Sequence, residues 1–168
     1  MTDDARSTIL ARLQAARGAA HLAPVEHPGA YAPQAVSAAS RLERFVAQLT
    51  ASGARVEVSH AEPPLGTESA SFRGALGVSE SGAIWVVPRT NEARQQLFLA
   101  EHVTLVLHAE AVVETLHEAY AQLDVAAPPF GCFVCGPSKT ADIEQTLVVG
   151  AHGPLALTVV LVERTPTD

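Results

Sequence analysis

The feature that most constrains the fold is the run over residues 155–162, which is apolar at nearly every position. A strand with one face in water alternates apolar and polar residues, whereas a strand covered on both faces does not. Fully covered strands belong mainly to parallel sheets, whose neighbouring strands are joined by crossover connections, usually helices. The run therefore predicts an α/β protein with a mainly parallel sheet flanked by helices.

The rest of the chain alternates between strand-like and helical patterns, which supports that class. Further strands are expected at residues 54–58, 74–78, 83–87, 103–107 and 130–135. Helices are expected at residues 2–18, from 37–40 to 53, and at 90–101, 109–123 and 140–149. We expect residues 1–53 to form an N-terminal helical arm packed on the core. Residues 54–168 then form the α/β domain, and the two parts make a single folding unit.

Charge and composition exclude several classes of protein. The chain has 168 residues, of which 48% are hydrophobic, enough for a sizeable core. No apolar run is long enough for a transmembrane helix. The acidic start lacks the apolar segment of a secretory signal. A net charge of -7 with dispersed basic residues argues against nucleic acid and membrane as partners. Two cysteines without a signal fit the cytoplasm, so we expect a cytoplasmic protein.

The segment 136–144 reads Gly-Pro-Ser-Lys-Thr-Ala-Asp-Ile-Glu and lies between an expected strand and an expected helix. A helix start offers free N–H groups to an anion. Ser138 and Thr140 would add hydroxyls, and Lys139, the only lysine, would add a positive charge. The alternative is a plain capping motif in which Asp142 only complements the helix dipole. Residue types alone leave both interpretations open.

This segment and its continuation to residue 154 resemble the C-terminal signature of the LUD-domain family, which includes the lactate utilization protein C subunits. The family usually has arginine where this chain has Lys139, and valine where it has Ala151. After the signature comes the turn Gly-Ala-His-Gly-Pro, which contains His152. The match is long and nearly unbroken.

Two weaker matches extend the resemblance to residues 74–162. Residues 78–83 resemble the family's Ala-Glu-Thr-Gly-Thr turn, with Ser81 and Ala83 in place of the threonines. Residues 100–103 resemble its Pro-Glu-His-Ile segment. The resemblance implies a fold similar to the sugar-isomerase and CoA-transferase group. It also implies a part in oxidising lactate to pyruvate beside iron–sulfur subunits.

Glu80 and the two cysteines each allow a chemical and a structural interpretation. In CoA transferases of similar fold, a glutamate in a turn is the nucleophile; alternatively, Glu80 caps a turn or binds a polar ligand. Cys132 and Cys135 have redox CxxC spacing, but positions i and i+3 of a strand point to opposite faces. We expect two buried structural cysteines that are not bonded to each other.

The sequence therefore predicts a LUD-domain subunit of an L-lactate-to-pyruvate oxidation system. Iron–sulfur clusters are expected in partner subunits and no cofactor or metal in this chain. The chain itself would assemble with those subunits or bind a small anionic metabolite; whether it is catalytic stays open. The candidate ligand-binding residues are Glu80, Gly82, Gly136, Ser138, Lys139, Thr140, Asp142, Glu144 and His152. The alternatives are a stand-alone small-molecule enzyme of the CoA-transferase or isomerase-like group, and a thiol–disulfide protein.

Overall fold

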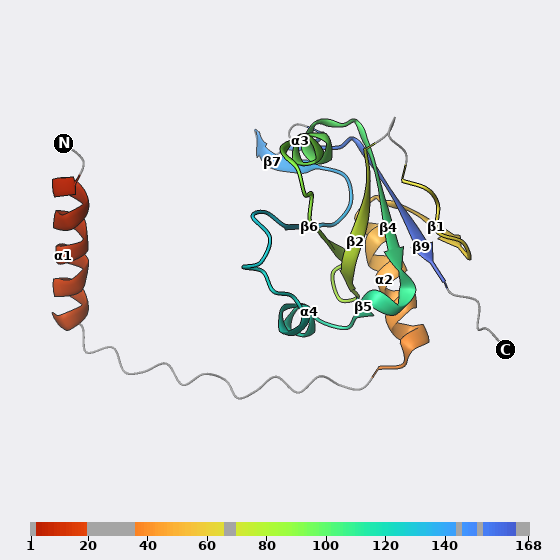
Figure 1. Ribbon diagram of the computed structural model, residues 1–168, viewed down its shortest axis with the longest axis horizontal. Coiled ribbons are helices and arrows are strands. Elements are labelled where there is room, and N and C mark those ends of the chain that lie inside the picture. Colours follow the sequence, from red (N-terminus) through yellow and green to blue (C-terminus); the bar gives the residue numbers. More distant parts are fainter. Residues whose placement is uncertain (1–2, 20–35, 66–69, 144–145, 151–152, 164–168) are drawn as a thin grey trace. The chain divides into compact units, whose positions relative to one another are not determined.

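A computed structural model describes residues 3–19, 36–65, 70–143, 146–150 and 153–163. The chain divides into two compact units, residues 1–32 and 33–168. The first unit contains helix α1 (Asp3–Ala19). Its apolar side chains Ile9, Leu10 and Leu13 are exposed. The second unit contains every strand and the three other α-helices that the structure describes (Figure 1).

The core of the second unit is a mixed sheet whose central strands are parallel. Its order is β1-β9-β4-β2-β3-β6. Parallel pairs join β1 (Arg55–Ser59) to β9 (Ala156–Val162), β9 to β4 (His102–His108), and β4 to β2 (Ala70–Val78). Antiparallel pairs join β2 to β3 (Ala83–Val86) and β3 to β6 (Cys132–Val134). The predicted class, a mainly parallel sheet flanked by helices, is confirmed.

Strand β2 belongs to two pairing patterns along its length. Residues 70–73 pair with β4, whereas residues 74–78 pair with β3, and the register shifts between Gly74 and Leu76. The end of β2 also pairs in parallel with the short β5 (Val112–Val113). The carboxyl ends of β2 and β5 therefore lie side by side.

Helix α2 (Ala38–Ala51) covers one face of the sheet. Ser37 caps its start by accepting a hydrogen bond from the Ser40 N–H. Phe45 and Leu49 are fully buried against sheet residues of the main core. Helix α4 (Leu116–Gln122) instead contributes Ala119 to a second cluster around Trp85. Helix α3 (Asn91–Leu99), capped by Thr90, buries Leu97 in the main core.

The predicted helix over residues 140–149 is wrong. The segment is an antiparallel pair of β7 (Lys139–Ile143) and β8 (Thr146–Val149). Its β-branched residues favour extended backbone over helix, and two strands can satisfy each other's backbone groups locally. No helix therefore begins at the signature segment, and the expected helix-start anion site has no structural basis.

The predicted helix over residues 109–123 is only partly correct. A short 3₁₀ turn (Ala109–Ala111) is followed by β5, and only Leu116–Gln122 is α-helical. Pairing with β2 draws Val112 and Val113 into the sheet, which overrides the helical spacing of the apolar residues.

Coverage of β9 is less complete than its apolar sequence predicts. Leu157, Val159 and Leu161 face the core and are buried, whereas Ala156, Thr158 and Val160 are only half-buried. None of the helices in the described ranges is long and apolar enough to cross a membrane.

Candidate functional site

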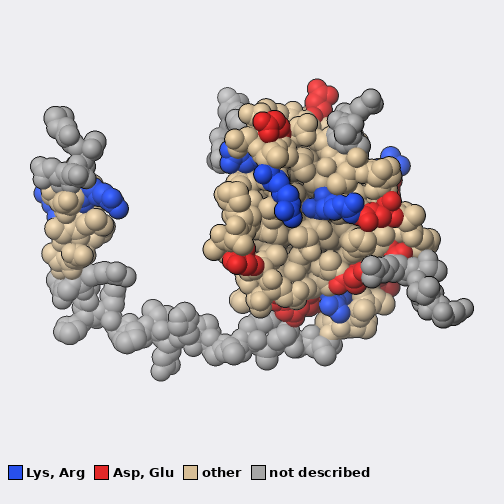
Figure 2. All heavy atoms as spheres, in the orientation of Figure 1, with Lys and Arg blue, Asp and Glu red and all other residues tan. Residues whose placement is uncertain are grey.

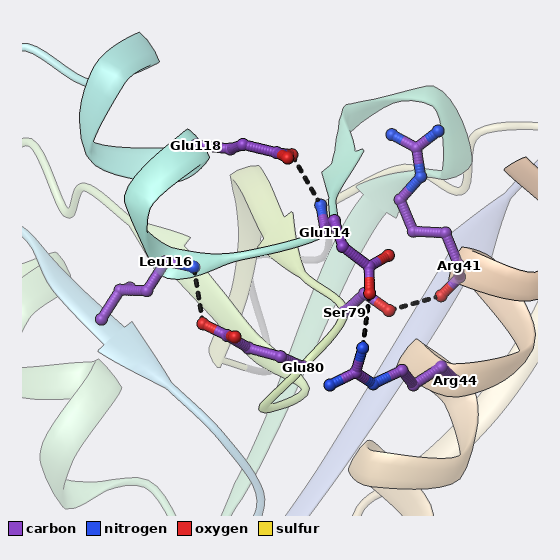
Figure 3. A network of polar contacts seen from close by, with 7 residues as sticks. All are labelled: Arg41, Arg44, Ser79, Glu80, Glu114, Leu116 and Glu118. Carbon is purple, nitrogen blue, oxygen red and sulfur yellow. Dashed lines mark hydrogen bonds and ion pairs between the residues drawn. The ribbon is translucent and has the colours of Figure 1, made fainter. Parts of the chain in front are cut away.

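Glu80 lies in the turn that follows β2, beside the start of α4 (Figure 3). Its carboxylate accepts a hydrogen bond of 2.7 Å from the Leu116 N–H. The Glu80 N–H in turn donates to the Glu114 carbonyl. Glu80 thus supplies a partner for a backbone N–H that the first turn of α4 leaves unpaired. A nucleophilic Glu80 would have to give up this bond.

A second carboxylate, Glu114, is buried one strand away and pairs with Arg44 of α2 (Figure 3). The Glu114 Oε2 atom is buried without a hydrogen-bond partner among the described residues. The Ser79 hydroxyl donates to the Arg41 carbonyl at 2.8 Å, and the Arg41 guanidinium donates to the Val112 carbonyl at 3.2 Å. These contacts fix α2 to the carboxyl ends of β2 and β5.

Gly82 and Gly136 bring the two family-like segments to the same end of α2. Both have positive φ, +71° and +75°. A Cβ on Gly82 would lie 2.8 Å from the Leu49 nitrogen, and one on Gly136 would lie 2.6 Å from the Ser52 carbonyl oxygen. Only glycine permits this backbone and this close approach. The structure therefore places both predicted residues against the end of a helix.

Lys139 and Ser138 complete this contact. The Lys139 ammonium donates to the Ser52 carbonyl at 2.5 Å, as cations do at helix carboxyl ends. The Ser138 N–H donates to the Pro154 carbonyl, and the Ser138 carbonyl accepts from the Gly150 N–H. These groups satisfy the protein's own backbone.

The cysteines differ from the predicted pair of buried thiols. Both are free, as expected, but Cys132 is half-buried and Cys135 is exposed. Burial raises the pKa of the Cys132 thiol. The Cys135 thiol donates to the Ser81 carbonyl at 3.0 Å, which joins the signature segment to the turn after β2.

A shallow hollow of about 290 Å³ opens beside this junction. We call it the signature hollow; it is lined by residues 97–98, 132–139 and 153–154. Ser138, Lys139, Gly136 and both cysteines thus share one surface. Glu80 is not among the described residues that line it.

The remaining predicted residues give less information. Thr140 pairs with Val148 in the hairpin, and Asp142 belongs to β7. The side chain of Asp142 lies outside the described part of the structure, and so do Glu144 and His152. Ligand binding by the nine candidate residues stays a prediction.

Sequence reasoning missed Arg44, Ser52 and Glu114. Each acts through a partner distant in the sequence, 70 residues away for Arg44 and Glu114 and 87 for Ser52 and Lys139. No local motif marks such pairs. Only the burial of Glu114, which is 8% exposed, identifies it afterwards.

Comparison with known proteins identifies the family. The family model of the LUD domain matches residues 38–162, which contain every strand and helix of the α/β core described above. The chain belongs to the LUD-domain family. This LUD domain includes α2, so the helix whose end meets both signature segments is part of the matched region.

Curated relatives carry the name lactate utilization protein C. The protein from Oceanobacillus iheyensis is 29% identical over 94 residues, which are 52% of this chain and 40% of the relative. The protein from Geobacillus thermodenitrificans is 33% identical over 93 residues, which are 52% and 39%. An Escherichia coli relative, uncharacterized protein YkgG, is 31% identical over 94 residues, which are 52% and 40%. The matched part of this chain thus spans about 40% of the length of these relatives.

A solved structure shares the fold. The crystal structure of a DUF162 family protein from Deinococcus radiodurans superposes with a TM-score of 0.53 at 18% identity. The superposition covers 76% of this chain and 99% of that one.

Proposed function

We propose that this LUD domain serves L-lactate utilization, as a subunit of a system that oxidises L-lactate to pyruvate in the cytoplasm. The names of relatives at about 30% identity support this assignment. Electron transfer would reside in iron–sulfur partner subunits, because two cysteines cannot hold a cluster alone.

The observation that carries the proposal is the meeting of the two family-like segments at the end of α2. The Cys135–Ser81 contact joins them, and the signature hollow lies beside that contact. The backbone groups and the lysine of this region are occupied within the protein. We therefore assign the surface around the hollow to contact with a partner subunit or a small anionic metabolite. The buried contacts beneath this surface hold the two segments in position.

The test is recovery of iron from native purification. The tagged full-length chain is expressed in its own host on L-lactate, and the material that co-purifies is assayed for iron and for its electron paramagnetic spectrum. We expect iron–sulfur subunits to accompany the wild-type chain. Cys135→Arg, which fills the rim of the hollow, should lose them. Val58→Arg, an exposed change on the strand at the opposite end of the sheet, should keep them.

If both variants retain the iron–sulfur subunits, the signature hollow is not the contact surface. Absence of iron–sulfur subunits from the wild-type preparation would overturn the subunit role. Turnover of a small acyl or sugar substrate by the isolated chain, lost in Glu80→Gln, would favour the stand-alone enzyme instead.

A further inference from the structure

Two neighbouring hollows share lining residues and form one cleft beside the β2–β3 pair. The larger, about 750 Å³, has Trp85 and Val87 among its lining residues. The smaller, about 310 Å³, lies between Phe130 and the start of α3. Pro88, Arg89 and Pro129 line both, so Arg89 stands at their junction. We call this space the arginine cleft; none of its described lining residues also lines the signature hollow.

Basic side chains gather at this cleft although the protein carries a net charge of -7. Figure 2 shows Lys and Arg crossing the middle of one face of the larger unit, with carboxylates mainly toward its margins. Arg73, Arg89 and Arg94 line the cleft. Glu62 neutralises Arg73. Among the described lining residues, Asp124 is the only carboxylate, and it lines only the larger hollow. The positive charge is therefore concentrated around Arg89 and Arg94.

These two arginines differ in how far their side chains are held in place. The Arg94 guanidinium lies 5.4 Å above the centre of the Phe130 ring and donates to Asn91 Oδ1 at 3.3 Å, which restricts its position. Arg89 is exposed and has no carboxylate within ion-pair distance in the described part of the chain. The exposed guanidinium of Arg89, beside the restrained guanidinium of Arg94, can donate paired hydrogen bonds to a carboxylate or phosphate group.

Around Trp85 the lining of the larger hollow is mainly apolar. Trp85 packs against Phe133, with ring centroids 4.9 Å apart, and against Gly131. A Cβ on Gly131 would lie 2.3 Å from the indole ring, so the glycine lets the chain pass close to the ring without a side chain. The remaining part of the indole contributes to the lining of the cleft together with Val87 and Phe72. Trp85 is 8% exposed and Val87 is half-buried, so a flat apolar group would cover what remains exposed of these two side chains.

We propose that the arginine cleft binds an organic anion whose carboxylate or phosphate head lies between Arg89 and Arg94 and whose flat apolar body lies over Trp85 and Val87. The cleft has the size of ordinary small-molecule sites, roughly 300–1,000 Å³. A three-carbon acid such as lactate would fill a small part of it and leave the apolar end in water. The start of α3 is not needed, because Thr90 accepts a hydrogen bond from the Ala93 N–H and the Glu92 carboxylate accepts one from its own N–H.

Trp85 makes the cleft directly observable, since it is the only tryptophan in the chain. Intrinsic fluorescence of the full-length protein is titrated with phenyl phosphate and with benzoate, which differ in the head group. Inorganic phosphate supplies a head without a body, and lactate supplies a head with a very small one. We expect a saturable change for at least one aromatic anion and a much weaker change for phosphate and lactate.

Substitutions of single basic residues test where the head group of the anion binds. Arg89→Ala should raise the dissociation constant at least about tenfold, because it removes a charged hydrogen bond. Arg89→Lys should recover part of the loss. Arg55→Ala, an exposed arginine on β1, should change nothing, and Lys139→Ala should leave binding intact. Circular dichroism and melting temperature confirm that each variant is folded.

Three results would overturn the proposal. They are no saturable Trp85 change with any aromatic anion, equal affinity for phosphate alone, or equal affinity in wild type and Arg89→Ala. Loss of binding in Lys139→Ala with retention in Arg89→Ala would place the anion at the signature hollow instead. That outcome would leave the lactate-utilization proposal standing, so the two proposals fail separately.

Discussion

The Lys139 ammonium donates a hydrogen bond of 2.5 Å to the Ser52 carbonyl oxygen, so the single lysine of the chain closes the carboxyl end of α2. Position 139 is arginine in the usual family signature, and arginine can also donate there. Helix capping therefore accounts for a cation at position 139 of this chain.

Lys139→Ala is expected to lower the free energy of unfolding by about 0.5–1 kcal/mol, because Lys139 is exposed and its interaction with the helix end is screened. Lys139→Arg should retain most of the stability. Urea unfolding of the three proteins measures the difference, and added salt should narrow it. A loss in the alanine variant that is unchanged at high salt would contradict a capping charge.

Arg44→Ala leaves the buried Glu114 carboxylate without its cation and should cost about 2 kcal/mol. This is less than for a fully buried pair, because the Arg44 side chain is 47% exposed. Adding Glu114→Gln should recover roughly half of the loss, since the buried charge is removed. The matched control is Arg55→Ala, which breaks the exposed Arg55–Glu57 pair and should cost under about 0.5 kcal/mol. Equal costs for the two arginines would refute the role given to Glu114.

Gly82→Ala should destabilise the protein by about 3 kcal/mol, because it adds a backbone clash with Leu49 to the strain of positive φ. Gly53→Ala is the control: φ is +92°, but a Cβ there meets its nearest neighbour at 3.6 Å. Its cost should be about 1 kcal/mol, from backbone strain alone. Thermal and urea unfolding rank the two. Similar values would mean that α2 moves freely away from the turn.

Cys132 should react with a thiol reagent more slowly than Cys135. Its burial limits access and raises its pKa, so a smaller fraction is thiolate at a given pH. The unfolded state ionises first as the pH rises through the ordinary thiol pKa. Cys132 therefore makes a contribution to stability that is complete at neutral pH and declines in alkali. Alkylation timed by mass spectrometry on Cys132→Ser and Cys135→Ser checks the order, and faster labelling of Cys132 would disprove it.

The sequence predicted elements whose apolar pattern matches their final environment. Phe45 and Leu49 mark the buried stripe of α2, and the apolar run at the end of the chain becomes β9. Prediction failed at residues 140–149, where a local hairpin formed in place of a helix, and at residues 112–113, where pairing with a distant strand decided the backbone. Val112 and Val113 read as part of a helix because their spacing allows it, yet the free edge of β2 takes them as β5.

The candidate site was predicted as a group of residue types but not as a geometry. Gly82, Gly136 and Lys139 do lie close to one another. They could be singled out in the sequence because glycine and a single lysine are conspicuous residue types. What they converge on, the end of α2, depends on Ser52 and Leu49, whose residue types signal nothing. The arginine cleft escaped notice because Arg73, Arg89 and Arg94 are scattered in sequence and share no motif with Trp85.

Strand β9 follows all other described strands in the sequence, yet it lies between β1 and β4. During synthesis, β1 and β4 are therefore made before the strand that lies between them. Until β9 is made, the facing edges of β1 and β4 lack their hydrogen-bond partners, and Leu105 lacks its neighbours Val159 and Leu161. Because parallel pairing of such distant segments is slow, the nascent chain presents two unpaired strand edges until its last strand is made. We therefore expect the edges of β1 and β4 to be open to aggregation until β9 has been made.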